Sequence, residues 1–240
     1  MPVALVTGAS RGLGLALAGG LADHGWSLVV DARSEEPLRD AAAEHGARVG
    51  SAGEVVALAG SVTDPDHRAA LVRAARDLGG LDLLVNNAGT LGPSPLPAME
   101  KLGLAAYREI LEVGVVAPLA LTQLALAEFR GRQGAIVNIT SDAAVEAYAG
   151  WGGYGSAKAA FEQWSSVLAV ELSEAREDVR VWWVDPGDLR TQMHQDAFPG
   201  EDISDRPLPH TVVPAFLRLI GERRPSGRYR AADLLSEVPA

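Results

Sequence analysis

Cysteine is absent from this chain of 240 residues. Its absence excludes disulfide bonds, thiolate nucleophiles and cysteine-ligated metal sites, and it leaves the redox compartment undetermined. Positive charge is also scarce, because 21 lysines and arginines stand against 31 aspartates and glutamates, which gives a formal net charge of −10. A surface with this balance has no general attraction for nucleic acid or for an anionic membrane, so we expect neither as a partner.

Long hydrophobic runs are also missing. No apolar stretch approaches the ~20 residues that span a bilayer, so we expect no membrane segment. The apolar run at residues 3–6 begins almost at the first residue and leaves no room for a secretion signal, which favours a cytoplasmic protein. We expect no metal site either, because the histidines show no metal-ligand spacing. They are His24, His45, His67, His194 and His210.

Short apolar runs rich in β-branched residues recur along the chain, and the segments between them are long enough for helices. The predicted strands are residues 3–6, 27–30, 55–58, 81–85, 135–139 and 179–184, with a last one at 227–230. Hydrophobic residues make up 48% of the chain and charged residues 22%, as in ordinary globular proteins. The alternation predicts an α/β fold: one Rossmann-like domain over residues 1–240, with a doubly wound parallel sheet and helices on both faces.

Two proline-rich patches interrupt this alternation, at residues 93–97 and 188–214. Either could be a simple connector between helices and strands. Because the α/β pattern continues on both sides of each patch, we favour loops over a site, and we assign residues 188–214 as a substrate-binding loop or lid.

A glycine-rich turn follows the first strand and opens a helical pattern. Glycines at such a place let the backbone turn tightly and approach a pyrophosphate, which then lies at the helix N-terminus. The turn therefore predicts a dinucleotide site. Its candidate contacts are Gly8, Ser10, Arg11, Gly12, Leu13 and Gly14.

Ser141, Tyr154 and Lys158 form the strongest constellation of chemical groups in the chain. Tyr154 and Lys158 are four residues apart, so on a helix they share one face. An ammonium beside a phenol favours the phenolate, so we expect Lys158 to lower the pKa of Tyr154 and Tyr154 to act as the acid/base. Ser141 follows a predicted strand, where its hydroxyl can hydrogen-bond a substrate oxygen. The alternative is an ordinary surface tyrosine and lysine on one helix.

These motifs together resemble the short-chain dehydrogenase/reductase family over nearly the whole chain. The matching segments are the T-G-x-x-x-G-x-G turn at residues 7–14, Asn86-Asn87-Ala88-Gly89 after the fourth strand, and Tyr154-x-x-x-Lys158. The resemblance implies a catalytic Ser141, Tyr154 and Lys158 beside a nicotinamide that supplies the hydride. It also implies cofactor contacts at Val62, Asn86, Ala88, Gly89, Tyr154, Lys158, Pro186, Gly187 and Thr191.

The residues after the second strand select the cofactor in this family. An acidic residue there selects NAD, and basic residues there and in the glycine-rich turn select NADP. Here Ala32 occupies the acidic position and Arg33 the basic one, while Arg11 lies in the turn. We therefore predict NADP(H) over NAD(H), with Asp31 facing elsewhere; a register shift of one residue would reverse this. The alternative is that both arginines are solvated surface charges.

The chain departs from the family at two places. Gly114 stands where the family has an active-site asparagine that passes protons through a water to the lysine. We expect a tolerated gap in which a second water takes over. The last strand lacks the usual Asp-Gly-Gly closure, and the tail from Ala231 has no clear assignment.

The combined features predict an NADPH-dependent oxidoreductase that interconverts a carbonyl and an alcohol and reduces a small or medium, partly apolar ketone or aldehyde. Pocket candidates are Leu91 to Leu96, Ala143, Tyr148, Trp151, Met193, His194 and Phe198. Two alternatives stay open: a dinucleotide-binding regulator or assembly subunit without redox chemistry, and a lyase or isomerase that uses Tyr154 as a base. The resemblance implies a homodimer or homotetramer that pairs the helices at about 103–129 and 152–174.

Overall fold

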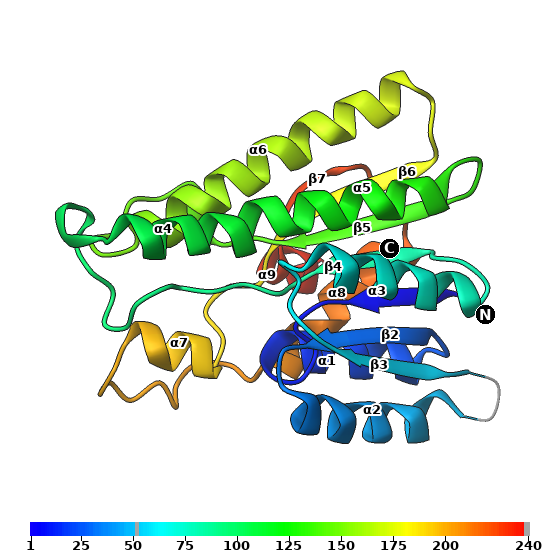
Figure 1. Ribbon diagram of the computed structural model, residues 1–240, viewed down its shortest axis with the longest axis horizontal. Coiled ribbons are helices and arrows are strands. Elements are labelled where there is room, and N and C mark those ends of the chain that lie inside the picture. Colours follow the sequence, from blue (N-terminus) through cyan, green and yellow to red (C-terminus); the bar gives the residue numbers. More distant parts are fainter. Residues whose placement is uncertain (51–52, 238–240) are drawn as a thin grey trace.

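A parallel sheet with helices on both faces carries the structure, a computed structural model that describes residues 1–50 and 53–237 (Figure 1). Within this part of the chain the strand order is β3-β2-β1-β4-β5-β6-β7, and every neighbouring pair is parallel. The strands are β1 (Val3–Val6), β2 (Ser27–Ala32), β3 (Val55–Ala59), β4 (Leu83–Asn86), β5 (Gly134–Ile139), β6 (Val179–Asp185) and β7 (Gly227–Arg230). The predicted fold class is confirmed.

The central strands are apolar along their whole length because the sheet is covered on both faces. Every residue of β1, β2, β4 and β5 is buried. Several strand boundaries differ from the prediction, and the largest differences are in β2 and β4. Strand β2 continues through Asp31 and Ala32, and β4 begins at Leu83 rather than at Leu81. Asp31 is therefore a buried strand residue, which matters for the site below.

Helices cover the two faces of the sheet in separate layers. On one face α1 (Gly12–Asp23), α2 (Glu35–Val49) and α8 (Val213–Gly221) share a hydrophobic core with the sheet. On the other face the core is completed by α3 (Pro65–Asp77), α5 (Ala117–Phe129) and α6 (Gly152–Glu174). The remaining helical elements are α4 (Leu104–Leu111), α7 (Gln192–Ala197), α9 (Ala231–Ser236), the π-helical η2 (Glu112–Val116), and the 3-10 turns η1 (Met99–Lys101), η3 (Asp142–Ala144) and η4 (Pro209–Val212).

One helical run corrects the sequence analysis. Elements α4, η2 and α5 form a continuous helix, Leu104–Phe129, which among the described residues is long and apolar enough to cross a membrane by length and composition. The expectation that no stretch approaches this length was therefore wrong. A helix that packs against the sheet of an α/β fold passes the same test, and α5 contributes Leu121, Ala125 and Phe129 to the core. The absence of a membrane segment stays a prediction.

The strand order reverses direction between β1 and β4, which are neighbours in the sheet. In open α/β sheets a ligand binds in the crevice outside the carboxyl ends of the strands at such a switch point. The segments that leave β1, β4, β5 and β6 all start at this end of the sheet, and Figure 1 shows α7 lying beyond it. The topology thus brings together the glycine-rich turn, Asn87, Ser141 and the segment from Pro186.

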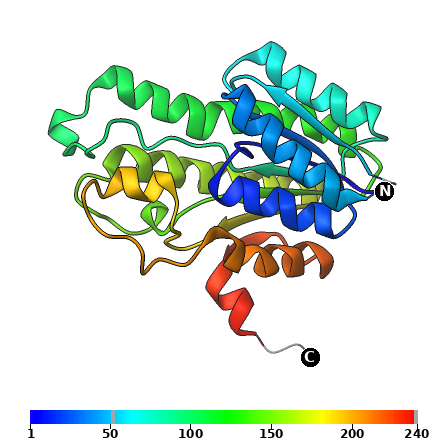
Figure 2. The same cartoon turned by 90° about the horizontal axis from the view of Figure 1, so that it is seen from below.

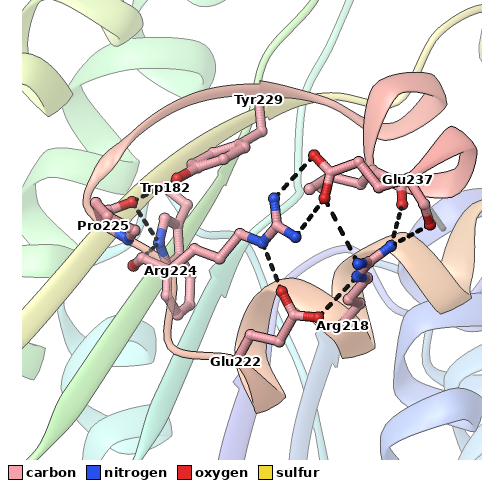
Figure 3. A network of polar contacts seen from close by, with 8 residues as sticks. Trp182, Arg218, Glu222, Arg224, Pro225, Tyr229 and Glu237 are labelled. Atoms are coloured by element: carbon pink, nitrogen blue, oxygen red, sulfur yellow. Dashed lines mark hydrogen bonds and ion pairs between the residues drawn. The ribbon is translucent and has the colours of Figure 1, made fainter. Parts of the chain in front are cut away.

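Charged side chains fasten the end of the chain to the body of the molecule (Figure 3). Arg218 and Arg224 each pair with both Glu222 and Glu237. Arg218 also donates to the carbonyl oxygens of Leu234 and Glu237, at 3.1 and 2.7 Å. The tail from Ala231, which had no assignment from its sequence, therefore forms helix α9 over Ala231–Ser236, which docks beside α8 (Figure 2), while residues 238–240 lie outside the described part of the chain.

Two aromatic residues, Trp182 and Tyr229, hold the loop that leads into β7. The indole Nε1 of Trp182, a fully buried residue of β6, donates to the carbonyl oxygens of Arg224 and Pro225 at 2.9 and 3.1 Å. The Tyr229 hydroxyl donates to the Pro225 carbonyl at 2.8 Å. These bonds fix the position at which β7 joins the sheet.

Gly14 marks the closest approach of α1 to the glycine-rich turn. A Cβ at Gly14 would lie 2.4 Å from the Gly8 carbonyl oxygen and 2.5 Å from Asn87 Nδ2. No side chain fits there without a shift of the backbone. Gly46 in α2 is the opposite case, because a Cβ on it would meet nothing within 4 Å.

We expect Gly14→Ala to lower the free energy of unfolding by about 1–3 kcal/mol, because overpacking displaces backbone. The control Gly46→Ala should raise it by about 0.5–1 kcal/mol, because alanine is the better helix former at an open position. Urea denaturation measures both. A Gly14→Ala protein as stable as wild type would show that the turn yields easily.

Candidate active site

A cavity of about 1720 Å³ lies along the carboxyl ends of the strands. It extends from the glycine-rich turn to Tyr154 and Lys158, so one space joins the two predicted sites. The predicted site residues that line it are Gly8, Ser10, Arg11, Gly12, Leu13, Arg33, Val62, Ala88, Gly89, Ser141, Tyr154, Lys158, Pro186, Gly187 and Thr191. Gly14 and Asn86 are the predicted contacts that the structure places outside this lining.

The glycine-rich turn has the conformation that a phosphate site needs. Gly8 and Gly12 have φ of +67° and +59°, a left-handed region that side chains rarely adopt. Helix α1 begins directly behind the turn, with Arg11 at the N-cap, and no side chain caps it. The first backbone N–H groups of α1 thus stay available to an anion at the positive end of the helix. The turn fits the pyrophosphate of a dinucleotide.

Asn87 braces this turn, a role that the sequence reasoning missed. Its Nδ2 donates to the carbonyl oxygens of Thr7 and Gly8 at 2.8 and 3.2 Å. The backbone N–H groups of Asn87 and Ala88 both donate to Thr7 Oγ1 at 3.0 Å. The motif at residues 86–89 was the available signal, but only the pairing of β4 with β1 shows what the amide binds.

Asn86 points into the protein instead of the cavity. Its Nδ2 donates to Asn138 Oδ1 at 2.8 Å and to Thr122 Oγ1 at 3.1 Å. Asn138 Nδ2 in turn donates to Ser165 Oγ at 2.7 Å. This buried chain joins β4 and β5 to helices α5 and α6, so the Asn86 side chain stabilises the interior.

Both carboxylate oxygens of Asp31 contact other groups of the protein. Oδ1 accepts from the Gly8 N–H at 2.9 Å, and Oδ2 lies 3.2 Å from His67 Nε2. By contrast, Arg11 and Arg33 are exposed and line the cavity, and neither guanidinium has an ion pair within residues 1–50 and 53–237. This end of the cavity therefore offers two cations and a carboxylate that is already engaged.

Tyr154 and Lys158 lie one turn apart on α6, with Lys158 buried and Tyr154 partly buried. Lys158 Nζ donates to the Ile139 carbonyl oxygen at 2.6 Å and lies 5.5 Å from the centre of the Tyr154 ring. The ammonium is thus fixed at the end of β5, against the ring of the tyrosine.

Burial dominates the titration of both groups. It raises the pKa of the Tyr154 hydroxyl well above its usual value; the Ser141 hydroxyl acts in the opposite direction, and the carboxylates of Asp185 and Asp142 raise it further. Burial also lowers the pKa of Lys158 to about 8, against a smaller opposing effect of Glu162. The expectation of a lowered pKa for Tyr154 is wrong for this structure, because burial disfavours the phenolate more than its neighbours favour it.

Ser141 is oriented by its neighbour Asp142, which the sequence analysis did not single out. The Ser141 hydroxyl donates to Asp142 Oδ1 at 2.9 Å and accepts from the Ala143 N–H at 3.2 Å. Asp142 Oδ2 accepts from the Tyr148 hydroxyl at 2.9 Å. The proton of Ser141 thus points at the Asp142 carboxylate.

Aromatic side chains connect the predicted lid to Tyr154. The Trp151 ring packs edge-on against Tyr154 at 5.7 Å between centres and contacts Phe198 at 5.9 Å. Phe198 in turn lies 5.0 Å from the His194 ring. The wall of the cavity beside Tyr154 is therefore aromatic.

The predicted pocket residues divide into two groups. Those that line the cavity are Leu91, Tyr148, Trp151, Met193, His194 and Phe198. Gly92 to Leu96 and Ala143 do not. The proline-rich patch at 93–97 supports the lid instead, because the Ser94 hydroxyl donates to the Asp196 carbonyl of α7 at 2.6 Å. Within residues 188–214, the stretches 188–194 and 208–210 line the cavity together with Phe198.

Gly114 lies in the π-helical turn η2 and is buried. Such turns inside α-helices are frequent at functional sites. A Cβ at Gly114 would meet only the Cβ of Ala157, at an ordinary 3.5 Å. The position therefore has room for a Cβ atom, which glycine does not supply.

Comparison with known proteins gives a consistent result. A family model described as short chain dehydrogenase matches residues 2–202. The uncharacterized oxidoreductase YciK of Escherichia coli K12 is 31% identical over 94% of this chain and 89% of its own length. Sepiapterin reductase of Mus musculus is 37% identical over 80% of this chain and 76% of its own. A short chain dehydrogenase from Shigella flexneri 2a complexed with NADP is 30% identical, with a TM-score of 0.86 over 96% of this chain and 97% of that chain.

The low pKa of Lys158 can be measured directly, because the chain has two lysines, Lys101 and Lys158. In protein labelled with ¹³Cε-lysine, we expect the Lys158 resonance to titrate with a pKa of about 8; a Lys101→Arg variant assigns it. Glu162→Gln should lower this pKa further, since it removes a carboxylate that favours the ammonium. A Lys158 resonance that titrates near the usual lysine value of about 10.4 would contradict the burial argument.

Proposed function

Since this chain belongs to the short-chain dehydrogenase family and is an oxidoreductase, we propose that it interconverts a carbonyl and an alcohol with NADP(H), working as a reductase of ketones or aldehydes. The observation that carries the proposal is the single cavity that joins the glycine-rich turn to Tyr154, Lys158 and Ser141. A dinucleotide on the turn and a carbonyl compound beside Tyr154 would share that space. When bound, the nicotinamide nucleotide supplies the hydride.

Tyr154 can act as the proton donor in the reduction. Its raised pKa keeps the hydroxyl protonated at neutral pH, the form that can protonate the carbonyl oxygen during reduction. In the opposite direction the same hydroxyl must first lose its proton, which the same pKa disfavours. This asymmetry supports reduction as the direction that works best near neutral pH.

Lys158 and Ser141 prepare the site around that proton. The ammonium of Lys158, anchored on the Ile139 carbonyl, places a positive charge against the Tyr154 ring and favours any negative charge that develops there. The Asp142 carboxylate accepts a hydrogen bond from the Ser141 hydroxyl. To donate to a substrate oxygen, Ser141 must exchange the Asp142 carboxylate for that oxygen.

The choice of NADP(H) rests on the charges at the other end of the cavity. Two exposed guanidinium groups, Arg11 and Arg33, can bind a 2′-phosphate, and arginine is suited to bidentate recognition of phosphate. Asp31 does not oppose them, because the Gly8 N–H and His67 occupy its oxygens. The Shigella flexneri protein complexed with NADP supports the same cofactor class.

For the substrate we propose a small or medium, partly apolar carbonyl compound. The aromatic wall of Trp151 and Phe198 beside Tyr154 can pack against a flat or apolar group. Relatives named as reductases, sepiapterin reductase among them, agree with carbonyl reduction as the chemistry.

We expect Arg33→Ala to raise the Kd of NADPH by about 10- to 100-fold, since a hydrogen bond to a charged group contributes about 1.5–3 kcal/mol. The Kd of NADH should hardly change, because NADH has no 2′-phosphate. Arg39→Ala, which removes an exposed arginine of α2 outside the cavity lining, is the matched control. Calorimetric titration measures these values, and equal losses for both nucleotides would refute the assignment.

Tyr154→Phe keeps the ring but removes the proton, so we expect kcat to fall by about 10²-fold or more while NADPH still binds. NADPH absorbance with a panel of ketones and aldehydes measures turnover. Tyr107→Phe is the control, because Tyr107 contacts Ser156 at 3.1 Å outside the cavity lining and should keep its kcat.

The same assay separates the alternatives. A wild-type protein that binds NADPH but oxidises it with no carbonyl in the panel would favour a regulator. Conversion of a substrate without change in NADPH absorbance would favour a lyase or isomerase. A Tyr154→Phe protein with more than about a tenth of wild-type kcat would remove Tyr154 from the chemistry.

A further inference from the structure

Arg228 lies in β7, the last strand of the sheet, and its guanidinium contacts residues next to the candidate active site. Its Nε donates to both oxygens of Glu162, at 3.0 and 3.2 Å. Its Nη2 donates to the Ser141 carbonyl oxygen at 3.3 Å and lies 3.6 Å from Asp185 Oδ2. One guanidinium thus contacts helix α6 and the ends of β5 and β6, the elements that carry the catalytic groups.

The two carboxylates that Arg228 contacts stand next to the catalytic pair. Glu162 follows Lys158 by one turn of α6 and is a charged group that acts on its pKa. Asp185 is the last residue of β6, and its negative charge raises the pKa of Tyr154, as the charge of Glu162 raises that of Lys158. Their side chains are only 12% and 8% exposed, so water screens them poorly.

Other polar groups fix the two carboxylates without neutralising them. The Thr140 hydroxyl donates to Glu162 Oε1 at 2.7 Å, and the Gly187 N–H donates to Asp185 Oδ1 at 2.9 Å. Asp142 adds a third negative charge near Tyr154. In the part of the chain that the structure describes, Arg228 is the cation paired with Glu162 and Asp185.

We propose that Arg228 is a positioning residue of the active site: it balances the charges of Glu162 and Asp185 behind Lys158 and Tyr154, and it holds the backbone of Ser141 in place. Strand β7, which lacks the family's usual closing sequence, supplies this cation. The proposal rests on the proposed function for its effect on turnover, but its electrostatic part concerns Lys158 and can be measured without a substrate.

The titration of Lys158 tests the electrostatic part. With Arg228→Met, the unbalanced Glu162 carboxylate should favour the ammonium, so the pKa of Lys158 should rise by about 0.5 or more in ¹³Cε-lysine protein. Arg228→Lys keeps the charge and should restore the wild-type value. If Arg228→Met fails to fold, Arg228→Gln also removes the charge, keeps a hydrogen-bond donor and should give the same rise.

Arg224→Met is the matched control for damage to the end of the chain. Arg224 binds Glu222 and Glu237 rather than the active site, so its loss should lower Tm but leave the pKa of Lys158 unchanged (Figure 3). If Arg228→Met lowers Tm yet leaves the Lys158 pKa in place, Arg228 is a structural residue only and the proposal fails. A rise that Arg228→Lys does not reverse would also overturn it.

Turnover gives the second readout. Without Arg228, Asp185 and Asp142 should hold the proton on Tyr154 more strongly, so the midpoint of the pH profile of kcat should move to higher pH. Arg228→Lys should return the midpoint to its wild-type position, and an unmoved midpoint in Arg228→Met would contradict the proposal. If the wild-type protein turns over no carbonyl, the proposed function fails, and the Lys158 titration still decides the role of Arg228.

Discussion

Hydrogen bonds from Asn87 and to Asp31 fix the backbone of the glycine-rich turn, and the rest of the site depends on this arrangement. Asn87 binds the carbonyl oxygens of Thr7 and Gly8, and Asp31 binds the N–H of Gly8. Because both backbone groups of Gly8 are hydrogen-bonded, the turn is restrained, and so is the direction of the α1 N-terminus. Gly14 then allows α1 to lie against the turn without a gap. The protein's own groups thus hold the turn in the conformation that the proposed dinucleotide site needs.

At the other end of the cavity the dominant constraint is burial of charge. A buried phenol prefers its proton and a buried amine prefers to lose one, so Tyr154 and Lys158 are pushed toward their neutral forms. The surrounding carboxylates oppose this at Lys158 and reinforce it at Tyr154. Tyr154 therefore stays protonated next to an amine, Lys158, whose pKa is about 8. The protonation of both groups depends on the balance of the charges around them.

Much of this architecture could be predicted from sequence because it follows from local patterns. The apolar runs gave the strands, and the spacing of Tyr154 and Lys158 gave their common helix face. What failed depended on contacts between distant segments. Asn86 was placed at the cofactor, but the pairing of β4 and β5 turns its amide toward Asn138. The pKa of Tyr154 was misjudged because spacing on a helix shows which groups are neighbours but not how deeply the chain buries them.

The contact between Arg228 and the Ser141 carbonyl joins two segments that are synthesised at different times. The glycine-rich turn and its supports, Asp31 and Asn87, all belong to the first 90 residues and leave the ribosome early. Arg228 follows them by more than 130 residues. Because folding during synthesis starts at the N-terminus, the turn and its supports can form on a nascent chain in which Ser141 still lacks the contact with Arg228. A chain that stops before Arg228 would thus keep the turn with its supports and lose the hydrogen bond that holds the backbone of Ser141.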